Sequence, residues 1–458
     1  MAKLFKFAVR AVVAAAAGVV FAATGASYAH AADAATPALI EKGKNLAVAG
    51  DCIACHSTAG KPAYTGGLAI ASPLGTIYST NITPSTKAGI GSYSFEQFSR
   101  AVRGGVRADG SHLYPAMPYT AYAKLTDDDT AALYAYFMHG VKADDTPSPA
   151  TSLPFPFNLR FSMAVWNALY LDTKPYVADK SKSVEWNRGA YLAQGLAHCA
   201  TCHTPRNFLM GEISSQYLRG GSLGTWYAPD ITPGALSRSG WDQAALQAYL
   251  TTGHAPNCAT AGGPMLEAID KSFSQMDPQD VQAMAVYLTD LPAADQHAAP
   301  VPAATVLPLA TSDIAEMAGK IGAGERLYRN NCAACHQVNG DGVRGLPALR
   351  NHPGLRYPTA DNVGMAILEG VWPEHKQGMP GFEDQLSDRE VADLTNYVMA
   401  TFGQSKVTLN EHRVRELRAG SATSPLLVLS RAGMALGVLL IVALLWYWQR
   451  RRTLRAAP

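Results

Sequence analysis

The chain has 458 residues, of which 48% are hydrophobic and 16% are charged, and its formal net charge is +2. This length exceeds what one hydrophobic core usually supports and favours about three domains of ordinary size. The nearly balanced charge argues against a protein that binds nucleic acid, because such proteins carry a marked basic excess.

The first 31 residues have the features of a secretory signal peptide. Three basic residues precede an Ala/Val-rich run, and Ala29 and Ala31 provide the small side chains that a signal peptidase reads. An uncleaved membrane anchor is the alternative, but the apolar run is short for a span. We therefore expect cleavage after Ala31 and a mature protein outside the cytoplasm.

The sequence Cys-x-x-Cys-His occurs three times and uses six of the seven cysteines. The motif residues are Cys52, Cys55 and His56, then Cys199, Cys202 and His203, and finally Cys332, Cys335 and His336. Disulfides would not need a histidine after every second cysteine, and zinc usually takes four ligands where each motif offers three residues. A thioredoxin-like motif would follow a strand, and the sequence predicts none before these motifs.

The same motif is the attachment signature of c-type haem, in which two thiols add to two vinyl groups and the histidine becomes the proximal iron ligand. We therefore predict three covalently attached haem c groups. The seventh cysteine, Cys258, has no evident partner, and we expect an unpaired thiol without a functional role.

An internal repeat selects the ligands for the other side of each iron. Met117 and Met265 lie at nearly the same distance after their motif histidines, and Met379 follows the third motif. Met117 and Met379 each precede a proline, which suits a loop that presents a sulfur atom. We predict these three methionines as the distal ligands. The alternative distal ligands are His112, His254, His297, His352 and His375.

Each unit begins and ends with a predicted helix. Before each motif a helical segment carries a glycine that would allow close packing against the last helix of the unit, namely Gly43, Gly189 and Gly324. The last helices begin with capping-box spacing at Thr126 and Asp129, Asp277 and Asp280, and Ser387 and Glu390. In this alignment Met276 corresponds to Leu125 and Leu386, so we predict that it packs in the core.

This order of elements predicts an all-α fold of three class I cytochrome c-like domains in tandem, followed by a transmembrane helix. The predicted units are residues 32–145, 181–291 and 316–404, with a connector at 146–180, a Pro/Ala linker at 292–315 and a juxtamembrane segment at 405–424. The connector contains the helical pattern "RFSMAVWNALYL", which suits either a docking surface for a partner subunit or a brace between units. The linker suggests that the third unit is more independent than the first two.

Residues 425–448 are apolar enough for a membrane span, and the arginine-rich tail at 449–458 follows directly. The positive-inside rule places that tail in the cytoplasm and the rest of the chain in the periplasm. An amphipathic helix lying on the membrane is the alternative.

No set of residues suggests catalysis on an organic substrate. A haem with histidine and methionine as axial ligands has no open position and exchanges single electrons. Three such centres would form an electron path that ends near the membrane.

The words "GTIYSTNITP", "LYPAMPY", "WNRGAYL", "HCATCHTPRN" and "MPGF" resemble the triheme cytochrome c subunit of bacterial membrane-bound dehydrogenases. The passages "LPFPFNLR" and "TKPYV" look most like the partners of flavin-dependent fructose, sorbitol or gluconate dehydrogenases. This resemblance implies a heterotrimer of a catalytic FAD subunit, a small third subunit and this chain, and it implies that this chain passes electrons to ubiquinone in the inner membrane. The alternatives are the cytochrome subunit of a quinoprotein alcohol dehydrogenase and a component of a terminal oxidase or reductase chain.

Overall fold

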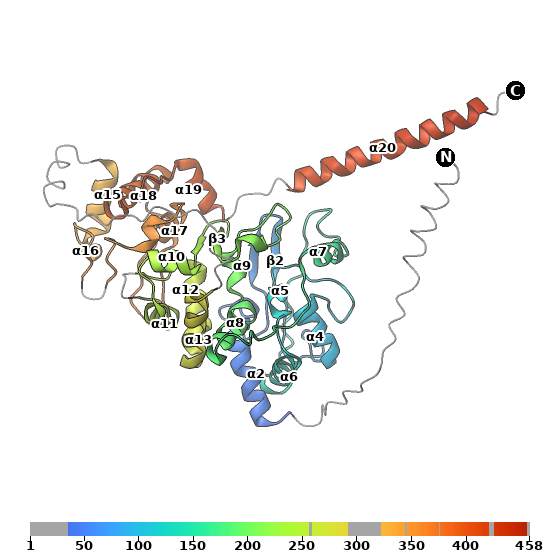
Figure 1. Cartoon of the computed structure of the whole chain (residues 1–458). Coiled ribbons are helices and arrows are strands. Elements are labelled where there is room, and N and C mark those ends of the chain that lie inside the picture. Colours follow the sequence, from blue (N-terminus) through green and yellow to red (C-terminus); the bar gives the residue numbers. More distant parts are fainter. Residues whose placement is uncertain are drawn as a thin grey trace. The chain divides into compact units, whose positions relative to one another are not determined.

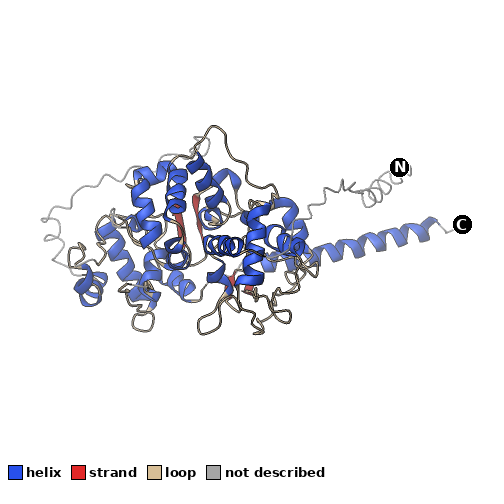
Figure 2. Ribbon diagram, turned by 90° about the horizontal axis from the view of Figure 1, so that it is seen from below, coloured by secondary structure: helices blue, strands red, loops and turns tan. Residues whose placement is uncertain are grey.

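The computed structural model describes residues 35–255, 259–291, 322–343, 346–374, 376–420 and 426–455. The predicted signal peptide at 1–31, Cys258 and the predicted linker at 292–315 lie outside these residues. Figure 2 shows that the described part is mainly helical, with little strand.

The elements follow the predicted repeat (Figure 1). The first unit contains α2 (Pro37–Ala49), α3 (Cys52–His56), β1 (Ala69–Ser72), β2 (Gly75–Tyr78), α4 (Phe95–Gly104), α5 (Tyr119–Tyr122), α6 (Asp127–Ala135) and the π-helix η1 (Tyr136–Gly140). The connector forms α7 (Ser162–Tyr170), which confirms its predicted helix.

The second unit contains α8 (Val184–Gln194), α9 (Cys199–His203), η2 (Ser214–Gln216), β3 (Arg219–Ser222), β4 (Tyr227–Asp230), α10 (Pro233–Arg238), α11 (Gln243–Thr252), α12 (Gly263–Lys271), η3 (Phe273–Gln275) and α13 (Pro278–Thr289). The third contains α15 (Ala323–Asn331), α16 (Ala333–His336), η6 (Pro353–Arg356), α17 (Asp361–Glu369) and α18 (Asp388–Gly403). The helix α19 (Glu411–Arg418) follows it in the predicted juxtamembrane segment. The chain continues into α20 (Leu426–Arg455).

In each unit the helix before the motif packs against the last long helix, so that α2 contacts α6, α8 contacts α13 and α15 contacts α18. The predicted glycines lie at these crossings. A Cβ atom would lie 1.9 Å from the Ala132 carbonyl oxygen at Gly43, 1.8 Å from that of Ala283 at Gly189 and 2.3 Å from that of Asp393 at Gly324. No side chain fits there, which confirms the predicted role of these glycines.

The last helices begin at the predicted caps. Side-chain oxygens of Thr126, Asp277 and Ser387 accept backbone N–H groups of the first turn. The reciprocal capping box forms at Ser387 and Glu390. The other two acids form ion pairs instead, Asp129 with Lys42 at 2.6 Å and Asp280 with Arg188 at 2.7 Å.

Two hairpins depart from the all-α prediction. Strands β1 and β2 pair antiparallel with Ala69 opposite Tyr78, and β3 pairs with β4 with Arg219 opposite Asp230. Each strand has only four residues, so neither hairpin has enough alternating side chains to produce a clear strand pattern in the sequence.

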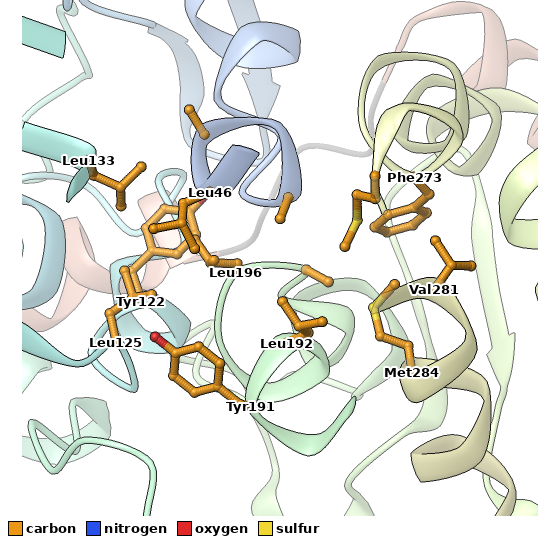
Figure 3. Packing of buried hydrophobic residues seen from close by; sticks show 14 of the residues in the cluster. Leu46, Tyr122, Leu125, Leu133, Tyr191, Leu192, Leu196, Phe273, Val281 and Met284 are labelled. Atoms are coloured by element: carbon orange, nitrogen blue, oxygen red, sulfur yellow. The ribbon is translucent and has the colours of Figure 1, made fainter. Parts of the chain in front are cut away.

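The first two units share one hydrophobic core. Figure 3 shows Leu46 and Tyr122 of the first unit close to Leu196 of the second. Tyr191 donates a 2.6 Å hydrogen bond to the carboxylate of Asp129, which joins α8 to α6. Met276 is buried in this core, as predicted, and so is Leu125.

The third unit is not independent of the second, contrary to the expectation from the linker. Trp226, in the second unit, is part of the core of the third. The backbone N–H and carbonyl of Tyr227 bond to the side chain of Asn362 at 2.7 and 2.8 Å. Arg413 in α19 donates to the carbonyl of Gly224 at 2.7 Å. The composition of a linker indicates how stiff the linker is, but it does not indicate whether the units on its two sides pack against each other.

Helix α20 is long and apolar enough to cross a membrane. The most apolar 18-residue window within Leu426–Arg451 has a mean hydropathy of 2.3, and this window is not buried against the rest of the described chain. Before it, α19 packs against α17 and α18 through the buried side chains of Val414 and Leu417. Much of the predicted juxtamembrane segment therefore packs against the third unit.

Candidate functional site

Each Cys-x-x-Cys-His motif forms one short helical turn, in α3, α9 and α16. The residue before the first cysteine adopts the left-handed conformation in two of them, with φ of 50° at Asp51 and 37° at His198. This sharp reversal separates the preceding helix from the motif and lets the motif turn away from it.

None of the six motif cysteines forms a disulfide. Burial raises the pKa of Cys52 and Cys199 to about 12 and that of Cys55 and Cys332 to about 11. Catalytic and zinc-binding cysteines need the opposite shift, because the thiolate is their active form. The raised pKa values of these four cysteines therefore do not favour a catalytic or a zinc-binding role.

The three motif histidines share one hydrogen-bonding arrangement. Nδ1 lies 2.6 Å from the carbonyl oxygen of Thr80 in His56, 2.7 Å from that of Pro229 in His203 and 2.9 Å from that of Pro347 in His336. A carbonyl oxygen only accepts, so Nδ1 carries the proton and the lone pair of Nε2 is free for a metal. Burial also lowers the pKa of each of these histidines, which keeps the ring neutral.

The hairpins position the first two of these carbonyls. Thr80 follows β2 and Pro229 lies within β4, at the same place in the repeated words "YSTNITP" and "YAPDITP". The following residues are Asn81 and Asp230. The side chain of Asn81 accepts hydrogen bonds from the backbone N–H and hydroxyl of Thr83, at 2.8 and 2.7 Å. Asp230 accepts the same two bonds from Thr232, at 2.8 and 2.6 Å. The repeated sequence segments thus form a turn that holds a backbone carbonyl oxygen against the imidazole ring of the motif histidine.

The predicted methionines lie in three different local settings. Met117 is in a bend before α5, Met265 is in the first turn of α12, and Met379 forms a two-bond bridge with Val371. Met117 and Met265 pack at the edge of the shared core.

A cavity of about 740 Å³ lies between the second and third units. Its lining includes Cys199, Cys202, His203 and Met265 of the second unit, and Cys332, Cys335, His336 and Met379 of the third. The structure thus brings both predicted ligand sets to one apolar cavity. In the first unit, Cys52 and Met117 contact the same hydrophobic core.

Two of the alternative histidines, His254 and His352, also line this cavity. Both ring nitrogens of His352 face backbone N–H groups, at 3.1 Å for Gly354 and 3.2 Å for Thr260. His112 lies in a β-bridge with Val106 in the first unit. His297 and His375 lie outside the described residues.

Among the described residues, no three His, Cys, Asp or Glu side chains converge in a way that could hold a metal ion by themselves. Iron in a porphyrin needs only axial ligands from the protein, because the macrocycle supplies the four equatorial nitrogens. The free Nε2 atoms, the paired motif cysteines and the apolar cavity all fit a covalently attached haem. The motif cysteines would hold it, and the histidines with the methionines would be the axial ligands.

The sequence did not reveal how closely the first two motifs approach each other. The Tyr122 ring meets the ring of His198 edge to face at 5.9 Å, and its hydroxyl donates to the carbonyl of Gly50 at 2.7 Å. Burial raises the pKa of Asp51 to about 8 and lowers that of His198 to about 4. No local pattern could have found this junction, since its residues come from two repeats.

Known proteins resemble almost the whole chain. The cytochrome c family model matches residues 40–140 and 321–402. The fructose dehydrogenase cytochrome subunit of Gluconobacter japonicus is 41% identical over 448 residues, which covers 91% of this chain and 92% of that protein. The chain belongs to the family of dehydrogenase cytochrome c subunits.

Two other members of the family match most of the chain at lower identity. The cytochrome c subunit of the quinone alcohol dehydrogenase of Gluconobacter oxydans is 36% identical, covering 89% of this chain and 87% of that protein. The gluconate 2-dehydrogenase cytochrome c subunit of Pantoea cypripedii is also 36% identical, covering 84% and 91%. Like these relatives, the chain is an electron-transfer subunit with cytochrome c domains that carry haem c. Their names also indicate that a catalytic dehydrogenase subunit accompanies it.

Proposed function

We propose that the chain carries three haem c groups and conducts electrons from a catalytic dehydrogenase subunit to ubiquinone. The observation that carries this proposal is the threefold arrangement in which a backbone carbonyl holds Nδ1 of His56, His203 and His336. When bound, haem supplies a centre that takes up and releases one electron at a time.

The proposed haem attachments are Cys52 with Cys55, Cys199 with Cys202, and Cys332 with Cys335. The distal ligands proposed are Met117, Met265 and Met379. The family model covers the first and third units, and the second is proposed as a third domain because it repeats the glycine crossing, the helix cap and the histidine-to-carbonyl bond. The proposed limits remain 32–145, 181–291 and 316–404.

The chain's residues have two tasks in this scheme. The carbonyls of Thr80, Pro229 and Pro347 keep each imidazole neutral and oriented. The shared core and the shared cavity keep the three sites in contact along the chain, because the first two motifs meet at Tyr122 and His198 and the last two open into one cavity. This supports an order of transfer that places the second unit between the other two.

The partner is proposed to be an FAD-containing subunit that oxidises a sugar, polyol or sugar acid of the fructose, sorbitol or gluconate type, accompanied by a small third subunit. The fructose dehydrogenase relative supports this class at 41% identity. The quinone alcohol dehydrogenase relatives make a quinoprotein partner the second candidate. Helix α20 would anchor the complex in the inner membrane, with the described units on the periplasmic side.

Two measurements on the purified native complex test this proposal. The mass of the denatured chain should exceed that of the mature polypeptide by three haems, and a smaller excess would refute the site assignment. Identification of the companion subunits and their cofactor should give a flavoprotein. A quinoprotein as the companion subunit would instead identify the chain as the cytochrome subunit of a quinone alcohol dehydrogenase. A haem-copper companion subunit would refute the dehydrogenase proposal.

A further inference from the structure

Figure 1 labels the helix α7. The side of this helix that is exposed to solvent is apolar. Its outward face consists of Phe161, Ala164, Val165, Ala168 and Leu169, all exposed, and it is called the α7 face below. The three large side chains are 70%, 64% and 62% exposed. A surface helix of a water-soluble protein normally buries this kind of face.

The polar side of α7 faces the body of the protein and fixes the helix in this orientation. The indole N–H of Trp166 donates to the carbonyl of Leu209 at 3.0 Å. Asn167 accepts from the hydroxyl of Tyr119 at 2.8 Å and donates to the carbonyl of Gly104 at 3.2 Å. A rotation that buried the α7 face would break these bonds, so its exposure is built into the fold.

The α7 face lies on a part of the chain that contacts the start of α20. Arg431 in α20 donates from Nε to the carbonyl of Phe155 at 3.1 Å. Phe155 precedes α7 by a few residues and is itself 52% exposed. Only residues 419–425 connect α19 to α20, and about seven residues reach at most roughly 25 Å. A membrane crossed by α20 therefore lies within a short distance of the described units, on the side of residues 155–169.

We propose that the α7 face lies in the membrane interface and fixes the orientation of the electron-transfer units above the bilayer. The inference rests on the proposed placement of α20 in the membrane. The five side chains of the α7 face offer no hydrogen-bonding group, whereas protein interfaces make about one hydrogen bond per 100–200 Å². A lipid surface requires none, and an apolar helix face binds there through buried area. Lipid is therefore the occupant that this surface fits.

The test uses the full-length, haem-loaded protein in phosphatidylcholine vesicles that contain a diazirine-tagged phospholipid. After photolysis, mass spectrometry of the peptides locates the label. We expect label on the peptide with residues 161–169 as well as on α20. In the double variant Val165→Glu/Leu169→Glu, label on this peptide should fall at least about tenfold, because both substitutions put a charged carboxylate where the lipid would bury an apolar side chain.

Val184→Glu is the matched control, because Val184 is an equally apolar, 88% exposed residue in the first turn of another helix, α8. It should leave the labelling of 161–169 unchanged. Unchanged haem absorption spectra show that all variants are folded. The readout also separates the two levels of the proposal. Label on α20 alone would overturn the role of α7 and leave the anchor intact, and label on neither would overturn both.

The same experiment on the native complex addresses the competing occupant. If the α7 face contacts a partner subunit, label at 161–169 will appear with the isolated chain and disappear in the complex, and this result would overturn the lipid assignment. Equal labelling in both preparations is the expected result.

Discussion

Replacing Gly189 by alanine is expected to open the crossing between α8 and α13. The new methyl carbon would lie 1.8 Å from the carbonyl oxygen of Ala283 and 2.4 Å from its carbonyl carbon. Both are backbone atoms that cannot rotate away. The helices must separate by at least about 1.2 Å to reach even the 3.0 Å limit for real Cβ contacts. A gap of this size forfeits roughly half of the contact energy across the crossing.

Overpacking of this kind costs about 3 kcal/mol, and the higher helix propensity of alanine returns up to about 1 kcal/mol. The net loss of about 2 kcal/mol should lower the guanidinium midpoint by roughly 0.5 M. Haem absorbance and circular dichroism of the haem-loaded chain would follow the transition. Because several units need not unfold in one step, the first transition is the one to compare.

The matched control is Gly104→Ala at the end of α4. There a Cβ atom would lie 3.9 Å from its nearest neighbour, Cγ of Arg100, and the stability should change by less than about 0.5 kcal/mol. Equal midpoints for the two variants and the parent protein would refute the close-crossing argument.

Three further changes give distinct readouts. Met117→Ala should convert one of three low-spin haems to high spin and slow quinone reduction, and a fully low-spin spectrum would refute the ligand assignment in the first unit. Burial raises the pKa of the Asp51 carboxyl from 3.8 to about 8, so its charged form is disfavoured in the fold and the parent protein should lose stability as pH rises from about 4 to about 8. Asp51→Asn should abolish this loss. A parent protein whose stability is constant over this range would contradict the shift. Ser387→Ala removes the hydroxyl that accepts the backbone N–H of Glu390 but keeps the backbone N–H that donates to the Glu390 carboxylate. It should cost about 1 kcal/mol in unfolding experiments, where Ser387→Thr should cost much less.

The local features of this fold were readable from the sequence because the repeat presents each of them more than once. One glycine near a motif is ambiguous, whereas Gly43, Gly189 and Gly324 at corresponding positions define a helix crossing. The caps at Thr126, Asp277 and Ser387 were identified in the same way. Met276 shows what comparing the repeats adds. Only its alignment with Leu125 and Leu386 distinguishes this core residue from a ligand candidate.

Most of the features that the sequence did not predict depend on contacts between units. Trp226 belongs to the second repeat but packs in the core of the third, and Tyr122 of the first repeat meets His198 of the second. Such contacts leave no periodic signal, because each residue is unique to its own repeat. The four-residue hairpins were not predicted for a different reason. They place the backbone carbonyl oxygens of Thr80 and Pro229, and every residue has a backbone carbonyl, so the choice of side chain does not reveal this role.

The core shared by the first two units also restricts how the protein can be assembled. Cys52 and Cys199 both pack at its edge, and the residues that bury them come from both halves. If Cys52 and Cys199 hold haem as proposed, the enzyme that forms the thioether bonds has to reach both sulfur atoms while the chain is still open. Both groups would then be attached before either half completes its folding.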